Sequence, residues 1–192
     1  TLLRVLSGLD KEFTGKFSLE KEDVGMMFQE PRLMPWLTVE QNVAFGLKGD
    51  QEALVHDLLG TVGLTGFEKH YPKDLSGGMS QRTAIARALV TEPEVLLLDE
   101  PFSAVDAFTK MQLQELLLSI WKKKNTTMLL VTHDIDEALY LCDRILILKG
   151  QPGVLAEVLT IKQSKPRNRT DTDLASIKAE ILHVLDLRET VS

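Results

Sequence analysis

The chain has 192 residues, enough for one sizeable α/β domain or for one domain with a small appendage. Its hydrophobic content of 44% and charged content of 26% are ordinary for a globular protein, and its net charge of −6 argues against a broad nucleic-acid-binding surface. No apolar run reaches the roughly 18 residues of a transmembrane helix, and no signal peptide is visible at Thr1. The single cysteine, Cys142, excludes an internal disulfide, and we expect it to fill space in the core.

The first elements are expected to be a helix, a short edge strand and a buried strand. Residues 1–8 have the pattern of an amphipathic helix, and residues 16–19 are expected to form the edge strand. Residues 24–28 form an apolar run of strand length, which Pro31 ends. Gln29 follows this strand directly and is within reach of a ligand there; the alternative is a glutamine hydrogen-bonded within its own loop.

The next loop holds a dense apolar cluster made of Leu33, Met34, Trp36 and Leu37. These side chains either pack under the following helices or remain exposed for a partner protein, and the sequence does not favour either arrangement. Thr38 is expected to cap a helix over residues 39–47. Asp50 is expected to cap another over residues 51–62. Residues 38–75 therefore form a small helical insert within an α/β chain.

A serine and two glycines, Ser76, Gly77 and Gly78, lead directly into a helical pattern that ends near Pro93. The free N–H groups at a helix N-terminus attract an anion, and glycine lets the backbone approach it closely. The alternative is an ordinary helix cap followed by flexible glycines.

Two adjacent carboxylates follow the next apolar run. Residues 95–98 are continuously apolar, which predicts a strand buried on both faces, and Asp99 and Glu100 come at its end. Carboxylates in such a place are costly unless they are used, and a cation near a phosphate is their usual use. A turn over residues 103–106 and a helix over residues 108–124 are expected next.

A second buried strand is expected over residues 128–131, followed by His133. Asp134 is expected to cap a helix over residues 135–141, and residues 144–148 to form a third strand. Alternating strands and helices predict a parallel sheet, in which ligands bind at the carboxyl ends of the strands. Gln29, the carboxylate pair and His133 all fall at such ends.

The last part of the chain combines a polar segment with an amphipathic helix. Residues 163–172 are interpreted as a linker, with a basic contact patch as the alternative. The final helix has an apolar face that we expect to pack on its own domain rather than on a partner. That face consists of Leu174, Ile177, Ile181, Val184 and Leu185.

These motifs, in this order, resemble those of the ATP-binding subunits of ABC transporters. Residues 75–79 resemble the family signature, residues 95–100 the Walker B strand with its catalytic glutamate, and residues 103–106 the D-loop. His133 resembles the switch histidine and Gln29 the Q-loop glutamine. The resemblance covers nearly the whole chain.

The resemblance implies an α/β fold: a P-loop NTPase-type core with a mainly parallel sheet flanked by helices, plus a small helical subdomain. The core would comprise residues 1–37 and 91–162. The helical subdomain would comprise residues 38–90, and residues 163–192 would form the linker and C-terminal helix.

The resemblance also implies ATP and Mg²⁺ as ligands. Asp99 and Gln29 would hold the metal, whereas Glu100 and His133 would be the catalytic residues. The residues implied in nucleotide binding are Thr1, Gln29, Ser76, Gly77, Gly78 and Asp106. The signature residues would close over the ATP of a second copy of the subunit, placed head to tail.

Residues 28–39, and the tail over residues 165–169 with its terminal helix, resemble importer subunits of the nitrate, sulfonate and taurine group. The implied partners are transmembrane permease subunits, a second ATP-binding subunit in a homodimer, and a periplasmic or extracellular solute-binding protein, without nucleic acid. The implied location is peripheral, on the cytoplasmic face of the inner membrane. The alternatives are a soluble ABC-type ATPase that is not engaged in transport and a non-catalytic interaction module.

The phosphate-binding Gly-x-x-x-x-Gly-Lys-[Ser/Thr] loop of such ATPases does not occur among the 192 residues, and Thr1 matches its last position. This is typical of a chain that lacks its native N-terminus. We therefore expect these residues alone to bind nucleotide poorly and to be inactive as an ATPase. Titration of the 192-residue chain with ATP should show no binding at micromolar concentrations, and micromolar affinity would contradict the prediction.

Overall fold

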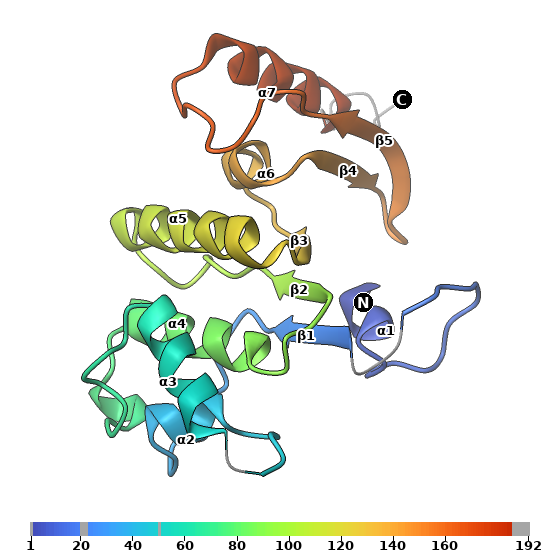
Figure 1. Cartoon of the computed structure of the whole chain (residues 1–192). Helices are drawn as coiled ribbons and strands as arrows, with labels where there is room; N and C mark the ends of the chain where they lie inside the picture. Colours follow the sequence, from blue (N-terminus) through green and yellow to red (C-terminus); the bar gives the residue numbers. More distant parts are fainter. Residues whose placement is uncertain (1, 20–22, 50, 186–192) are drawn as a thin grey trace. The chain divides into compact units, whose positions relative to one another are not determined.

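The computed structural model describes residues 2–19, 23–49 and 51–185. The chain divides into two compact units, Thr1–Val131 and Thr132–Ser192 (Figure 1). The four-part division expected from the sequence stays a prediction. In the described ranges, no helix is both long enough and apolar enough to span a membrane.

The first unit contains a three-stranded parallel sheet. Its strands are β1 (Val24–Met27), β2 (Val95–Asp99) and β3 (Thr127–Val131), in the spatial order β1-β2-β3. Residues 96–98 of β2 are buried, as expected of a continuously apolar strand at the centre of a sheet. The predicted α/β fold with a parallel sheet and helices is confirmed.

β3 is less buried than the sequence predicts. Each of its residues is exposed or half-buried, and 38% of the surface of Val131 is exposed. Within the first unit, β3 pairs on one side only, with β2. An apolar run does not by itself tell how much of a strand is buried.

Helices connect the strands of the first unit. α5 (Ala107–Lys124) lies between β2 and β3 in the chain, and α4 (Gly77–Leu89) packs against β1. Gly25 permits this packing, because a Cβ atom there would collide with the carbonyl oxygen of Ala88 in α4. The N-terminal helix α1 (Leu2–Leu6) contacts β2.

The edge strand expected over residues 16–19 is not formed. These residues are irregular and mostly exposed. The ring of Phe17 lies against Phe13, with 5.5 Å between the ring centroids. A short strand without a neighbouring strand to pair with is not stable, so the alternating sequence does not suffice here.

Residues 38–75 contain the expected helical insert. Thr38 caps α2 (Val39–Val43) by accepting from the N–H of Gln41, whose side chain accepts in return from the N–H of Thr38. α2 ends earlier than the sequence predicts. The second helix, α3 (Glu52–Thr61), is present, but its predicted cap, Asp50, lies outside the described residues.

A buried asparagine fixes the loop before α2. The side chain of Asn42 is fully buried, and its Oδ1 accepts from the N–H of Met34 at 2.7 Å. Its Nδ2 donates to the carbonyl oxygens of Met34, Leu37 and Thr38. The apolar loop is thus anchored by a polar side chain.

The second unit contains a β-hairpin between helices. Its elements are α6 (Ile135–Leu141), β4 (Arg144–Lys149), β5 (Val154–Thr160) and α7 (Thr172–Leu185). The sequence predicts β4 but not β5. The two strands are joined by a short turn after Lys149 and form a two-stranded sheet, so within this unit β4 pairs antiparallel rather than parallel.

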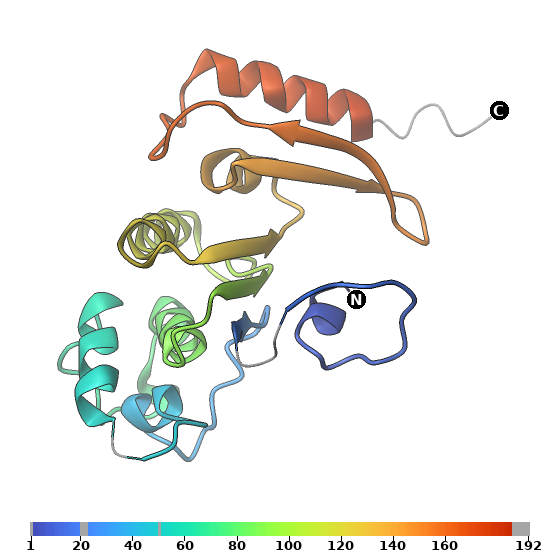
Figure 2. The same cartoon turned by 45° about the vertical axis from the view of Figure 1, so that its right-hand side comes forward.

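The final helix packs on its own unit, as predicted. Leu174 and Ile181 of α7 join a buried cluster with Leu139, Ile147 and Ile161. Ile177, Val184 and Leu185 pack against the same cluster. Figure 2 shows α7 running alongside the hairpin.

Cys142 follows α6 as its C-cap and is half-buried rather than enclosed in the core. Burial raises the pKa of its thiol to about 11. The thiolate is the reactive form of cysteine, so this side chain is chemically quiet at neutral pH.

We expect Cys142 to react with iodoacetamide at pH 8 on the order of 100-fold more slowly in the folded protein than in urea. The ordinary pKa of about 9 leaves a far larger thiolate fraction than a pKa of about 11. The ratio of the unfolded-state rate to the folded-state rate should fall as the pH rises from 9 towards 11. Over this range the thiol of the unfolded chain is already ionised, whereas the thiolate fraction of the folded protein still increases. Mass spectrometry reads a single adduct because the chain has one cysteine, and equal rates in both states would contradict the prediction.

Candidate active site

The carboxyl ends of β1 and β2 form the centre of the candidate site. Met27 of β1 lies opposite Leu98 of β2. The residues two positions further, Gln29 and Glu100, therefore emerge at the same edge of the sheet. The side-chain Nε2 of Gln29 donates a hydrogen bond to Oε2 of Glu100 at 3.3 Å. Two of the sequence-predicted site residues are thus in direct contact.

Glu100 has an unusual backbone conformation. Its φ is +43°, in the left-handed region that costs free energy for a residue with a side chain. Its N–H donates to the carbonyl oxygen of Val131 in β3 at 2.9 Å, and its carbonyl oxygen accepts from the N–H and hydroxyl of Ser103. These hydrogen bonds hold the carboxylate in place at the end of β2.

Asp99 is the last residue of β2 and is half-buried. Among the described residues, no group of three or more His, Cys, Asp or Glu side chains is arranged to hold a metal ion. Mg²⁺ usually keeps several waters and binds through one or two carboxylates together with phosphate oxygens. The side-chain oxygens of Asp99 and Gln29 are of the kind that Mg²⁺ accepts when it binds together with a nucleotide, and Mg²⁺ binding by these residues stays a prediction.

Ser76 is the N-cap of α4. Its Oγ accepts a hydrogen bond from the N–H of Met79 at 3.2 Å, and Ser76 and Gly77 are exposed. The alternative that the sequence left open, an ordinary helix cap, is therefore present. It does not exclude an anion, because the other N–H groups of the first turn of this 13-residue helix still carry the positive end of its dipole.

The second glycine of the signature is required by packing. A Cβ atom on Gly78 would lie 2.6 Å from Cγ2 of Thr109 in α5. A Cβ atom on Gly77 would make ordinary contact with Val105 and with the carbonyl oxygen of Ala104. The signature stretch and the turn over residues 103–106 therefore lie side by side.

Asp106 caps α5. Its Oδ1 accepts from the N–H groups of Phe108 and Thr109, both at 3.0 Å, and its Oδ2 accepts from the Thr109 hydroxyl at 2.6 Å. The hydrogen bond from that hydroxyl is the main cause that lowers the pKa of Asp106. Contact of this side chain with a nucleotide stays a prediction.

Two residues of α4 that the sequence motifs do not single out hold the loop after β1. Gln81 is buried, and its Nε2 donates to the carbonyl oxygen of Gln29 at 3.4 Å. The guanidinium of Arg87 donates to the carbonyl oxygens of Pro31 at 2.6 Å and Arg32 at 2.9 Å. The role of Gln81 could be inferred from the sequence, because helical spacing puts this polar residue on the buried apolar face of α4. No comparable sequence feature indicates the role of Arg87.

The remaining site residues lie elsewhere. His133 belongs to the second unit, where it is exposed and immediately precedes the cap of α6. Its contact with a γ-phosphate stays a prediction. Thr1 lies outside the described residues.

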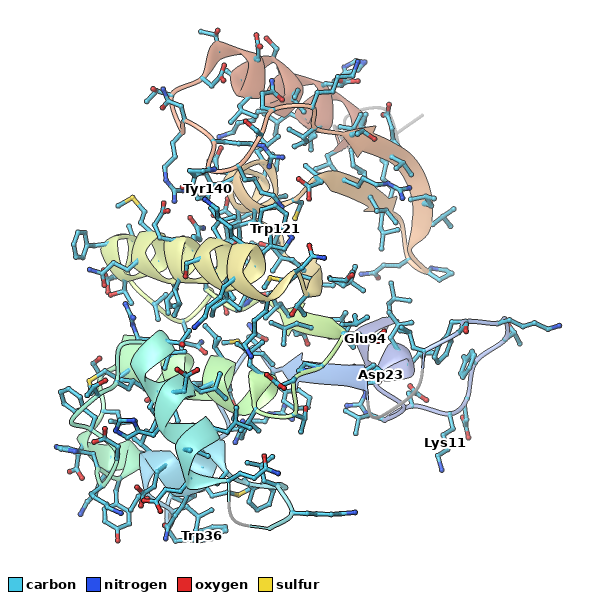
Figure 3. All side chains as sticks on the ribbon, viewed as in Figure 1. Lys11, Asp23, Trp36, Glu94, Trp121 and Tyr140 are labelled. Atoms are coloured by element: carbon cyan, nitrogen blue, oxygen red, sulfur yellow. The ribbon has the colours of Figure 1, made fainter. Side chains whose placement is uncertain are left out.

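Trp36 is the most exposed part of the apolar loop. It has 70% of its surface exposed and lies at the periphery of the first unit, beside α2 (Figure 3). Its neighbours Met34 and Leu37 are half-buried, and Asn42 binds their backbone. Of the two arrangements that the sequence left open, the exposed one holds for Trp36.

Known proteins resemble this chain over most of its length. The aliphatic sulfonates import ATP-binding protein SsuB of Bacillus subtilis is 50% identical over 199 residues, covering 98% of this chain and 78% of that protein. The corresponding SsuB 2 protein of Pseudomonas syringae pv. tomato is 51% identical, covering 100% of this chain and 83% of that protein.

A solved structure and a family profile point the same way. The dimeric structure of the ATP-binding cassette MJ0796, in a post-hydrolysis state bound to ADP and Pi, matches with a TM-score of 0.69 and 28% identity. The match covers 85% of this chain and 80% of that one. The sequence profile of the ABC transporter family matches residues 1–103. The chain therefore belongs to the ABC transporter family, as one of its ATP-binding, ATP-hydrolysing components.

Proposed function

We propose that this protein is the ATP-binding subunit of an importer for aliphatic sulfonates. It hydrolyses ATP as a head-to-tail dimer at the cytoplasmic face of the membrane, where separate permease subunits carry the solute. A solute-binding protein on the other side of the membrane delivers that solute. The proposal is supported by the names of relatives that are 50% and 51% identical, and by the resemblance of residues 28–39 to importers of this group.

The observation that carries the catalytic part is the hydrogen bond between Gln29 and Glu100 at the edge of the parallel sheet. Substrates of open α/β sheets bind at this edge. The bond orients the carboxylate of Glu100, and the strained turn at Glu100 keeps it at the end of the buried strand β2. A positioned carboxylate can accept a proton from an attacking water.

The other residues supply charge and alignment for phosphoryl transfer. Asp99 and Gln29 would hold Mg²⁺, which supplies charge neutralisation at the phosphates when bound. His133 contacts the γ-phosphate and keeps the water in line with Glu100. Thr1 contacts the α-phosphate.

The second ATP-binding subunit completes the site. Ser76, Gly77 and Gly78 present the N-terminus of α4 to the γ-phosphate that the other subunit holds. Two of these residues are exposed, as such a contact requires. Asp106 stabilises the turn that lies beside them and belongs to the same contact surface.

Trp36 is proposed to bind the permease. Its exposed indole is a large apolar surface, and side chains of this kind dominate the binding energy of protein interfaces. Asn42 and the cap at Thr38 hold its loop rigidly, so little conformational entropy is lost on binding.

We expect Glu100→Gln to lower ATP turnover by about 10²–10⁴-fold, because the amide cannot accept a proton from water. The variant is made in a protein that includes the phosphate-binding loop and is assembled with its membrane subunits in lipid vesicles. It should retain ATP, remain dimeric, and lose ATP-driven uptake of a labelled alkanesulfonate. Turnover, size-exclusion profile and uptake are measured together.

Glu94→Gln is the matched control for this experiment, because Glu94 directly precedes β2 and is exposed. It should hydrolyse ATP and transport like the wild type. A Glu100→Gln protein that stays monomeric with ATP would favour a non-catalytic interaction module. ATP hydrolysis without any alkanesulfonate uptake by the wild-type assembly would contradict the proposed solute.

Trp36→Ala should weaken association with the permease subunits more than it lowers ATPase activity, by about tenfold or more in affinity if the indole is a central contact. Co-purification and titration with detergent-solubilised permease measure the association. Leu182→Ala, at an exposed apolar position of α7, is the control. Equal losses of association and ATPase activity would identify Trp36 as a packing residue.

A further inference from the structure

His133 is fixed to the first turn of α6. The hydroxyl of Thr132 donates to Oε2 of Glu137 at 2.6 Å and accepts from the N–H of Asp134 at 3.0 Å. The carboxylate of Asp134 accepts from the N–H groups of Asp136 and Glu137. The side chains of both neighbours of His133 are thus hydrogen-bonded to the first turn of α6, so the orientation of this helix affects the orientation of the histidine.

α6 cannot set its own orientation. It has seven residues, and a helix this short is unstable in isolation because nucleation is costly. Its buried residue Leu139 belongs to the apolar cluster of the second unit, and Ile135 packs against that cluster. Apolar packing alone permits sliding and rotation, so directional contacts must define its position.

Arg167 provides such contacts at the C-terminal end of α6. Its side chain is fully buried, and Nη1 donates to the carbonyl oxygens of Leu139 at 2.9 Å, Tyr140 at 3.3 Å and Cys142 at 2.8 Å. Nη2 contacts Oδ1 of Asp143 at 3.3 Å. The last carbonyl groups of a helix have no partner within it, and here one guanidinium binds three of them, in the last turn and at the C-cap.

The same basic segment completes this C-terminal cap. Nζ of Lys165 donates to the carbonyl oxygen of Leu141 at 3.2 Å and to Oδ2 of Asp143 at 2.8 Å. Nε of Arg167 donates to the carbonyl oxygen of Gln163, which ties the cap to its own loop. Two cations thus meet the negative end of the α6 dipole. These buried side chains do not form the basic contact patch that the sequence left open.

A second contact holds the opposite end of α6. Nζ of Lys178 in α7 lies 2.8 Å from both carboxylate oxygens of Asp136, in the first turn of α6. Between the two ends, the guanidinium of Arg169 lies over the ring of Tyr140, 3.5 Å from its centroid. Residues 165–178 therefore contact α6 at its first turn, at Tyr140 and at its C-terminal end.

We propose that Arg167 and Lys178 are positioning residues for ATP hydrolysis: through α6 they hold His133 in the orientation in which it meets the γ-phosphate. The inference rests on the proposed role of His133. It makes residues 163–178 part of the catalytic apparatus, although no atom of this segment touches the substrate. Small displacements of a catalytic group lower the rate steeply while substrate binding is retained.

Two variants test this. Arg167→Lys keeps the charge but not the fork that binds several carbonyl oxygens, and we expect kcat to fall about tenfold with a KM for ATP within about twofold of wild type. Lys178→Met removes an exposed contact that folding does not require, and we expect kcat to fall about threefold. Lys162→Met, at an exposed lysine just before this segment, is the matched control and should behave like the wild type.

The assays use a protein that includes the phosphate-binding loop, as a dimer assembled with its membrane subunits. The fraction of folded protein is measured by thermal denaturation, and the rates are referred to it. Each variant is also made in a His133→Ala background. If the two residues act through His133, Arg167→Lys and Lys178→Met should lose most of their effect on kcat there.

Wild-type kcat in both variants, or equal losses with and without His133, would overturn the inference while leaving the proposed function intact. Wild-type hydrolysis by His133→Ala alone would instead contradict the proposed role of the histidine, and the inference would fall with it. A loss of kcat confined to proteins that retain His133 supports the inference.

Discussion

The parallel register of β1 and β2 is the constraint on which the candidate active site depends. Met27 lies opposite Leu98, so β1 and β2 end at the same edge of the sheet. Gln29 and Glu100, two residues further along each strand, therefore meet without a long loop to bring them together. A slip of one residue would turn one side chain to the other face of the sheet. α4 then fixes the loop after β1 through Arg87.

The strand ends at the candidate active site and the starts of the helices can be predicted from sequence, because each depends on residues close together in the chain or on a simple periodicity. The apolar run before Asp99 predicts a buried strand, and the rule for parallel sheets predicts that its end lies beside that of β1. Thr38 and Ser76 predict helix starts because their side chains satisfy N–H groups within three residues. In each case the interacting atoms are close in the chain or related by simple periodicity.

The features that sequence does not predict depend on partners far away in the chain. The antiparallel direction of β4 depends on its pairing with β5, a strand that the sequence does not predict. Arg167 lies in a polar segment whose composition is typical of an exposed linker. Its side chain is nevertheless buried against carbonyl oxygens of residues more than twenty positions earlier in the chain. A buried cation is tolerated only where several acceptors replace its water, and sequence periodicity contains no information about such acceptors.

The contact between Gly78 and Thr109 has a consequence for how mutational scans of this family are interpreted. Any side chain at position 78 would push the first turn of α4 away from α5, whether or not a nucleotide is present. Inactivity of a variant there therefore does not by itself report a lost phosphate contact. A compensating change at Thr109 to a smaller residue would separate the two causes, because it relieves the collision without restoring a donor. Gly78 is constrained by the fold of its own subunit, and the proposed contact with the ligand of a second subunit would be an additional constraint on the same residue.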